Sequence, residues 1–235
     1  MTAEEVVEEL RSLGSEATKR VLLKHGAREP FFGVKVEDLK KIQKRVKTDH
    51  RLALALYDTG ISDAMYLAGL IADDAKMTKK DLRRWAEAAY WHMLSEYTVP
   101  WVAAGSRYGR ELTLEWIESK KETVAAAGWS TLGSLVATRD DGELNLGELT
   151  HLLRRVQETI HRQPNRVRYA MNGFVIAVGC YARPLSDLAL QVAGQVGEVA
   201  VDMGGTACKI PYAPDYINKV RLRGAVGKKR KSAKC

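Results

Sequence analysis

The sequence predicts an all-α protein, an α-α superhelix in which helix pairs stack into a curved solenoid. Apolar residues recur at spacings of three and four along most of the chain, as in amphipathic helices. Segments with a polar face alternate with more apolar segments that are rich in Ala and Gly. Only short pieces such as GEVAVDM, residues 197–203, are candidates for strands. With 235 residues the chain can bury a substantial core as one domain or as an elongated array of helix pairs.

Helix-terminal signals define the first elements. Thr2 and Glu5 have the spacing of a capping box at the start of TAEEVVEELRSL, and Gly14 ends this helix. SEATKRVLLKHG follows and is closed by Gly26. The same periodicity predicts the remaining helices within residues 35–49, 49–60, 62–74, 78–94, 107–119, 121–138, 145–163, 165–182 and 184–197.

Three segments, AMYLAGLIA, VAAAGWSTLGSLVA and YAMNGFVIAVGCYA, are the apolar members of this alternation. Their small residues at helical spacing let neighbouring helices approach closely, as stacked helix pairs require. The segments are separated by roughly 40 to 60 residues, which is typical of HEAT-like repeats with an insertion. We therefore expect one concave face to be lined by helices at 64–72, 95–104, 124–137 and 167–181. An irregular helical bundle is the alternative.

The positive charge is concentrated at the C-terminal end. The formal net charge is +8, yet residues 1–218 hold 29 basic and 29 acidic residues and are net neutral. The sequence thus divides into a helical-repeat domain at 1–218 and a basic, flexible tail at 219–235. Such a tail is attracted to phosphate or anionic surfaces, although a solubilising terminus is the alternative. Its basic residues are Lys219, Arg221, Arg223, Lys228, Lys229, Arg230, Lys231 and Lys234.

Other features favour a cytoplasmic protein without a cofactor. The start, MTAEEVVEEL, is acidic and amphipathic, unlike a secretory signal. The longest apolar run, Phe174–Ala182, is too short to span a bilayer, so no membrane association is expected. Three widely spaced cysteines indicate reduced thiols. The five histidines show no paired metal-ligand spacing, so no metal site is expected.

Five segments together resemble a known family. EPFFGVKVEDLKKI is followed in order by SDAMYLAGLIAD, AYWHMLSEYTVPW, EWIES and NRVRYAMNGFVIAVG. This series resembles the DNA alkylation repair family over roughly residues 26–197. The resemblance implies HEAT-like helical repeats. It also implies a relation to DNA glycosylases that remove N3- and N7-alkylated purines while the duplex lies on a basic concave surface.

The resemblance assigns the site to the aromatic segment. The glycosylases carry Trp-Trp-Asp, a second Asp, and then a Val-Pro step. When the Val-Pro steps are aligned, Glu96 of this chain falls on the catalytic aspartate. Trp91 falls on the first tryptophan, and His92 falls on the neighbour that helps to form the aromatic cleft.

A carboxylate here has a chemical purpose. It stabilises positive charge that develops on the sugar as a cationic alkylated base leaves, and aromatic faces add cation–π attraction. Pro100 implies a helix that begins near residues 95–98, so Glu96 is expected at or just before its N-terminus, where the dipole favours the ionised form. A purely helix-capping role explains Glu96 equally well.

The chain also departs from the family pattern. Ala125–Ala127 stands where the glycosylases place an arginine, and Phe174 follows Gly173 where they place a second tryptophan. Phe174 is a candidate for the missing ring, and Arg166 or Arg168 for the missing guanidinium. A salt-bridged helix start is the alternative for both arginines.

Two functions therefore remain open. The first is a DNA glycosylase that excises N3- or N7-alkylated purines with Glu96 and Trp91 as catalytic residues. The second is a non-catalytic helical-repeat module that binds DNA or a protein partner through its concave face. The expected partner is double-stranded DNA, alkylated or unmodified, bound by a monomer. The residues expected to contact DNA are His92, Arg107, Arg166, Arg168, Phe174, Lys228, Lys229, Arg230 and Lys231.

Overall fold

The computed structural model describes residues 1–234; residue 235, the end of the predicted tail, lies outside them. Within this range the all-α prediction is confirmed, because the described residues form helices and no strand. The helices are α1 (Ala3–Leu13), α2 (Glu16–Lys24), α3 (Val36–Val46), α4 (His50–Asp58), α5 (Ser62–Ile71), α6 (Lys79–Ala88), α7 (Val99–Gly105), α8 (Gly109–Trp116), α9 (Glu122–Thr138), α10 (Leu146–Thr159), α11 (Asn165–Tyr181), α12 (Ser186–Val196) and α13 (Ala213–Leu222). A π-helical turn at Leu94–Thr98 precedes α7.

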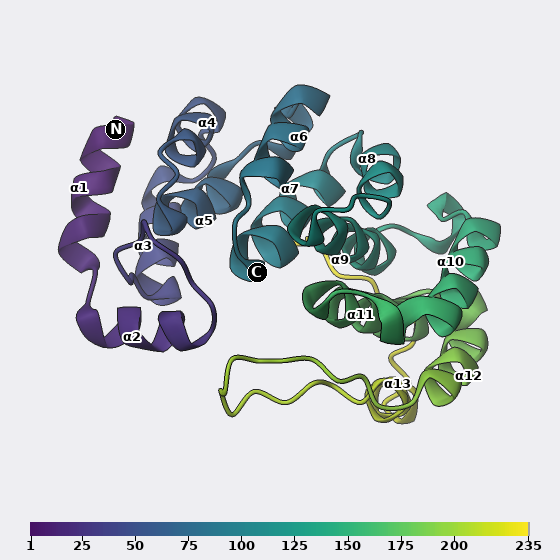
Figure 1. The fold of residues 1–235 in the computed structure, drawn as a ribbon. Coiled ribbons are helices and arrows are strands. Elements are labelled where there is room, and N and C mark those ends of the chain that lie inside the picture. Colours follow the sequence, from purple (N-terminus) through teal and green to yellow (C-terminus); the bar gives the residue numbers. More distant parts are fainter. Residues whose placement is uncertain (235) are drawn as a thin grey trace.

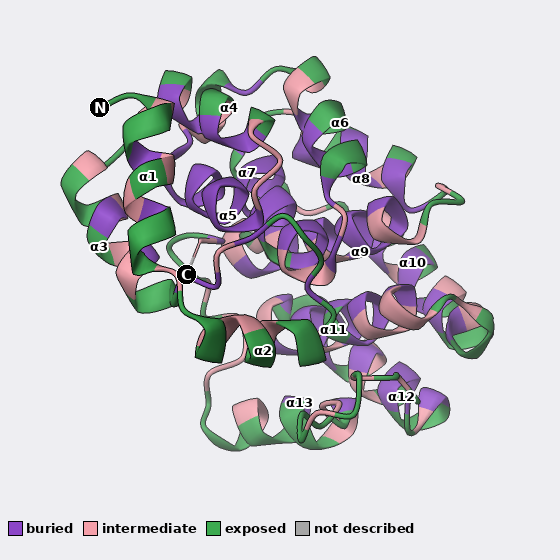
Figure 2. Ribbon diagram, turned by 60° about the vertical axis from the view of Figure 1, so that its left-hand side comes forward, coloured by how far each residue is buried: buried purple, intermediate pink, exposed green. Residues whose placement is uncertain are grey.

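The helices form two curved rows, which Figure 1 shows as an arc from α1 to α12. In the inner row α5 packs on the π turn, which packs on α7 and α9, and α11 packs on α9. Every residue of α5 is buried, whereas the outer helices keep exposed faces (Figure 2). The predicted row of four apolar inner helices is therefore confirmed.

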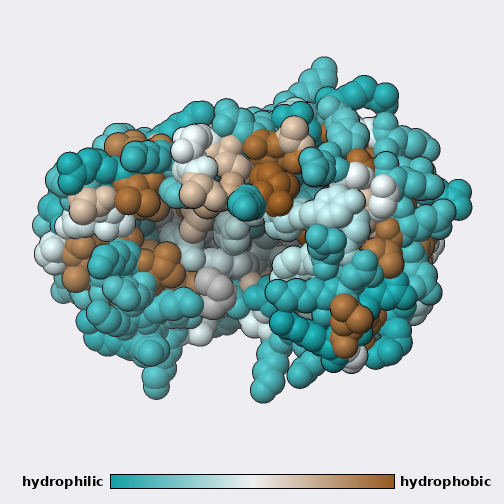
Figure 3. Space-filling model, turned by 90° about the horizontal axis from the view of Figure 1, so that it is seen from below, coloured by the Kyte–Doolittle hydropathy of each residue, from teal (hydrophilic) through white to brown (hydrophobic). Residues whose placement is uncertain are grey.

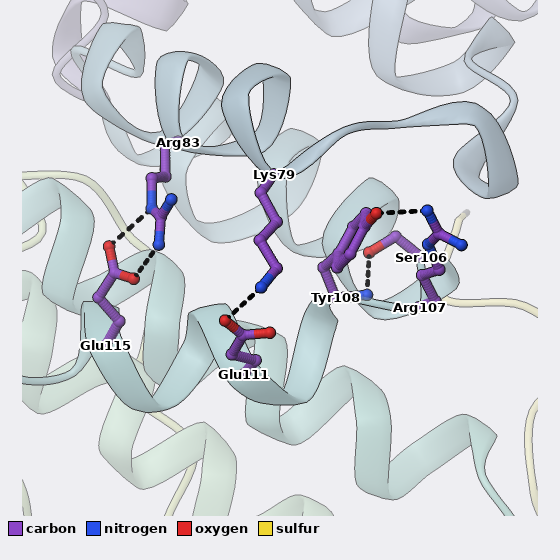
Figure 4. Close-up of polar contacts among 7 residues, drawn as sticks. All are labelled: Lys79, Arg83, Ser106, Arg107, Tyr108, Glu111 and Glu115. Carbon is purple, nitrogen blue, oxygen red and sulfur yellow. Dashed lines mark hydrogen bonds and ion pairs between the residues drawn. The ribbon is translucent and has the colours of Figure 1, made fainter.

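Ion pairs connect neighbouring helices of the outer row. Lys79 and Arg83 of α6 bind Glu111 and Glu115 of α8, with nitrogen–oxygen distances of 2.5 and 2.6 Å (Figure 4). Each exposed pair contributes at most about 1 kcal/mol. Because such pairs recur along the outer row, many charged side chains on the convex side are already paired with one another. Further pairs of this kind are Arg84–Asp58, Arg110–Glu148 and Arg155–Glu118.

The core consists of two hydrophobic clusters that meet at α9. Val124 and Ala127 of α9 belong to the N-terminal cluster, while Trp129 and Val136 belong to the C-terminal cluster. Because α9 contributes to both clusters, neighbouring helices approach it closely. At Gly128 an added Cβ would lie 2.8 Å from the backbone nitrogen of Ile117. Only a residue without a side chain fits that crossing.

The C-terminal residues fold against the body of the protein, in the region where the sequence predicted a basic, flexible tail. The proposed boundary at residue 218 lies inside α13, which was not predicted. Residues 223–234, here called the C-terminal strap, run back across the ends of the inner helices. Strap groups donate hydrogen bonds to the carbonyl oxygens of Cys180, Val136, Ala137 and Ala72, at 2.7–3.0 Å.

These contacts have a common physical reason. The four carbonyls lie at the C-terminal ends of α11, α9 and α5, where no helical N–H reaches them and the helix dipole is negative. The strap supplies both donors and positive charge there. Lys229 also pairs with Asp141 at 2.8 Å, and Lys234 pairs with Asp74 at 2.7 Å. Part of the tail charge is therefore used inside the molecule.

No single helix among residues 1–234 has the length and hydropathy of a membrane span. Asn165–Tyr181 and Arg183–Val196 meet those criteria only as a pair bent by 111°, in length and composition alone. In the same range, His, Cys, Asp and Glu side chains form no group of three or more that could hold a metal ion.

Two glycines in inner helices should respond oppositely to alanine. Gly128→Ala should lower the free energy of unfolding by about 1–3 kcal/mol, because the added methyl meets backbone that cannot move away. Gly173→Ala in α11 should raise it by up to about 1 kcal/mol, because nothing lies within 4 Å of the new Cβ and alanine favours the helix. Urea denaturation of the two variants measures the difference. Equal effects would contradict the close crossing at α9.

Candidate nucleic-acid interface

Two cavities lie on either side of the contacts of Arg166, which lines one of them and binds Glu96 and Tyr169, two residues that line the other. Seen from below, the molecule is hollowed at its centre between its N-terminal and C-terminal parts (Figure 3). The first cavity, here called the His92 cavity, has a volume of about 520 Å³. Its lining residues include Lys24, Arg28, Trp91, His92 and Arg166. The second, here called the tyrosine groove, has a volume of about 380 Å³ and is lined in part by Tyr97, Tyr169, Tyr181 and Tyr216.

The π turn positions Glu96. Pro100 has no N–H to donate to the carbonyl of Glu96, and its ring would clash with that carbonyl in a regular α-helix. The chain widens instead, so that the N–H of Val99 donates to the carbonyl of Leu94, five residues earlier. Glu96 thus lies inside a helical turn, and not at a helix N-terminus as the sequence predicted.

Both carboxylate oxygens of Glu96 bind Arg166. The Nε and one terminal nitrogen of the guanidinium donate to Oε1 and Oε2, each at 2.6 Å. The Glu96 side chain is 2% exposed and that of Arg166 is 17% exposed. The same guanidinium stacks 4.5 Å from the centre of the Tyr169 ring. A buried, bidentate ion pair therefore connects the π turn with the start of α11.

This pair sets the charge at the site. Burial raises the pKa of the Glu96 carboxyl above its usual value, and the hydrogen bonds from Arg166 oppose the rise. Burial lowers the pKa of Arg166, but the contact with Glu96 outweighs it, so the pKa of Arg166 is raised. The guanidinium stays protonated, and the two opposite charges cancel. Glu96 is bound by a partner instead of capping a helix.

Trp91 and His92 form one wall of the His92 cavity. The indole nitrogen of Trp91 donates to the hydroxyl of Ser62 at 2.7 Å, which fixes this buried ring. The ring of His92 lies against it, with 5.0 Å between ring centres. Burial, and then the positive charge of Arg166, lower the pKa of His92 to about 4. His92 is therefore neutral at physiological pH and offers no positive charge to a phosphate.

The other predicted residues are dispersed. Phe174 is fully buried against Trp129, with 5.3 Å between ring centres, so it exposes no surface for the predicted contact with DNA. Arg168 donates to the side chain of Asn165 at 3.3 Å and lines neither cavity. Arg107 lies apart from both cavities, on a smaller depression between α8, α9 and α10. On the strap, Lys229 is tied to Asp141, whereas Lys228, Arg230 and Lys231 are exposed.

Two features were missed from the sequence. One is the tyrosine groove. Tyr169, Gly173, Ala177 and Tyr181 follow one another every four residues along α11, so they share one face, and this spacing was the available signal. The other is the loop at 197–212. It reaches toward α2 (Figure 1), where Gly204 approaches the carbonyl oxygen of Lys24 closely.

The loop is also anchored to α11. Asn165 exchanges two hydrogen bonds with the backbone of Asp202, at 2.7 and 2.9 Å. Asn172 donates to the carbonyl of Pro211 at 2.9 Å. Through these contacts, the loop and α2 together limit access to the His92 cavity from that side.

Known proteins similar to this chain agree with the family resemblance seen in its sequence. The sequence profile of the family described as DNA alkylation repair enzyme matches residues 6–216. The uncharacterised proteins Lin0241 of Listeria innocua and Lmo0209 of Listeria monocytogenes are 33% and 34% identical to the chain over 229 residues, which are 95% of this chain and 99% of each relative. A solved structure superposes with a TM-score of 0.90 at 37% identity and covers both chains completely. It is described as a new family of proteins related to the HEAT-like repeat DNA glycosylases with affinity for branched DNA structures.

Removing one partner of the buried pair should be costly. Arg166→Ala should lower the free energy of unfolding by about 3–5 kcal/mol, because it leaves the Glu96 carboxylate buried without a partner. Glu96→Gln should cost less, because water reaches part of the guanidinium. The matched control is Arg83→Ala, which breaks an exposed pair of similar geometry and should cost less than about 1 kcal/mol. Similar losses for Arg166→Ala and Arg83→Ala in urea denaturation would refute this account.

Folding should weaken in acid because of His92. The folded pKa of about 4 lies below the unfolded value near 6.5, so protonation favours the unfolded chain. This contribution to stability is complete above pH 6.5 and is lost as the pH falls toward 4. Between pH 7 and pH 5 the loss should be about 2 kcal/mol, and His92→Gln should remove it. His151→Gln, on the exposed side of α10, is the control and should retain the wild-type pH dependence.

Proposed function

The chain belongs to the DNA alkylation repair enzyme family, and we propose that it is a DNA-binding protein that recognises branched DNA without excising bases. Its fold is that of the HEAT-like repeat DNA glycosylases and their relatives. The proposal concerns what the concave side does. It follows the second of the two functions that the sequence left open, with DNA as the partner and a monomer as the binding unit.

The observation that carries the proposal is the ion pair between Glu96 and Arg166. Base excision needs a negative charge directed at the sugar, which is preorganised for the positive charge that develops there. Here both carboxylate oxygens accept hydrogen bonds from one guanidinium, and the side chain is 2% exposed. The charge that would stabilise the transition state is cancelled within the protein. The burial of Phe174 removes the candidate for a second aromatic wall.

DNA binding without excision needs only positive charge and a suitable shape. Lys24 and Arg28 line the His92 cavity together with Glu122 and Asp202, and Arg230 lines the tyrosine groove. Lysine and arginine on a concave surface bind phosphates and release counterions. The preference for branch points is proposed because the full-length structural relative is described as having affinity for branched DNA structures.

Excision of N3- or N7-alkylated purines remains the second candidate. One observation favours it: the resemblance places a carboxylate, Glu96, at the position of the catalytic aspartate. For excision to occur, Arg166 would have to release Glu96 when DNA binds. The two functions therefore differ in a measurable product, a free alkylated base.

Two assays on the same purified protein separate the functions. In the first, fluorescence anisotropy compares a four-way junction with a linear duplex of the same base composition at a fixed salt concentration. We expect at least tenfold tighter binding to the junction. In the second, alkylated duplex DNA is incubated with the protein, and we expect no release of modified bases.

Either assay can overturn the proposal. Equal affinity for junction and duplex would remove the preference for branched DNA. Base release by the wild-type protein, lost in Glu96→Gln while DNA binding is retained, would establish the glycosylase function instead. Measurement in both variants at several salt concentrations distinguishes lost binding from lost chemistry, because phosphate contacts alone set the salt dependence.

A further inference from the structure

The tyrosine groove has the composition of a surface that stacks on flat rings. It lies between α9, α11, α13 and the π turn, and four tyrosines contribute to its walls. Tyr97 is 37% exposed and Tyr216 is 51% exposed, so these two rings are accessible. Tyrosine and other aromatic faces stack on every nucleobase, whatever its identity.

The floor of the groove is open. Gly173 lies in the middle of α11 and is exposed, and a Cβ built on it meets nothing within 4 Å. Gly133 of α9 faces the same groove, where an added Cβ would make only an ordinary contact of 3.6 Å with Ala177. A glycine inside a helix costs stability, and packing does not require one at residue 173. The absence of a side chain at Gly173 leaves free space in the groove that the tyrosine rings line.

The charge around the groove suits a nucleotide. Arg166 stacks on Tyr169, one of the lining residues, and Arg230 lines the groove near Tyr181. The one carboxylate among the described lining residues is that of Glu96, which is neutralised by Arg166. Arginine at the edge of an aromatic groove can bind the phosphate that follows a stacked base.

We propose that the tyrosine groove binds an unpaired nucleobase at a DNA branch point, stacked against Tyr97 and Tyr216 with its phosphate near Arg230. This inference rests on the proposed function and specifies its ligand as a junction that carries at least one unpaired nucleotide. Paired arms contact the basic residues outside the groove. An unpaired base at a branch point costs less to move into the groove than a paired base, because no base pair has to be broken.

The test compares two four-way junctions that differ only in one unpaired thymidine at the branch point. The wild-type protein should bind the junction with the unpaired base about five- to a hundredfold more tightly, the range that stacking on an aromatic side chain provides. Tyr216→Ala should abolish this ratio and leave the affinity for the fully paired junction unchanged. Tyr216→Phe keeps the ring and should retain the ratio.

The chain offers a matched control on the same helix end. Tyr212 precedes α13 and is 43% exposed, but it does not line the groove. Tyr212→Ala should therefore behave as the wild type. A second variant, Gly173→Leu, fills the groove floor without removing any side chain. Its Cβ meets nothing within 4 Å, so the variant should fold, and it should also abolish the ratio.

A direct signal comes from 2-aminopurine at the unpaired position. Its fluorescence should be quenched by the wild type and by Tyr212→Ala, but not by Tyr216→Ala. If the two junctions bind equally, or if Tyr216→Ala matches Tyr212→Ala, the stacking site is refuted while junction binding stands. If the wild type does not prefer either junction to a duplex, the proposed function itself fails, and the inference fails with it.

Discussion

The bidentate contact between Glu96 and Arg166 joins two parts of the chain that are seventy residues apart. Glu96 lies in a π turn next to the N-terminal hydrophobic cluster, and Arg166 begins the helix that fills the C-terminal cluster. A carboxylate at 2% exposure is stable only with a partner of this kind. The pair therefore fixes how the two halves of the concave surface face each other. It also determines the charge of the concave surface at this point. The negative charge of Glu96 is cancelled by the positive charge of Arg166.

The distribution of charge in the folded protein differs from that in the sequence. The excess of +8 comes from the C-terminal residues, yet Lys229 and Lys234 bind helix ends and carboxylates of the body. The convex side has its own pairs, such as Arg83 with Glu115. At the His92 cavity, Lys24 and Arg28 are matched in number by the carboxylates of Glu122 and Asp202, whereas Arg230 lines the tyrosine groove, where Glu96 is already paired with Arg166. Internal pairing thus leaves the tyrosine groove as the place where an anion meets a cation without a carboxylate partner.

Sequence reasoning found what depends on local pattern. Apolar periodicity and helix-terminal signals gave most helices, and the small residues of α5, α9 and α11 indicated the inner row. It failed where the deciding contact is distant. No local sequence pattern indicates that Arg166 is the partner of Glu96 or that Phe174 packs on Trp129. Nor does one indicate that lysines near the end of the chain bind the helix ends at Ala72 and Val136. The tyrosine face of α11 was visible as a four-residue spacing, but its partners Tyr97 and Tyr216 come from elsewhere in the chain.

The C-terminal strap also bears on how such a protein can evolve. Arrays of helix pairs commonly lengthen or shorten by duplication or loss of a repeat, because each repeat contacts only its neighbours. Here the strap passes from the end of α11 to the end of α5. Fully extended, the backbone from Gly227 to Lys234 covers roughly 25 Å, and three helix spacings of about 8–10 Å require nearly all of it. One more pair would lengthen the distance between the two anchors by further helix spacings of this size, so the length of the strap limits how many repeats fit between α5 and α11.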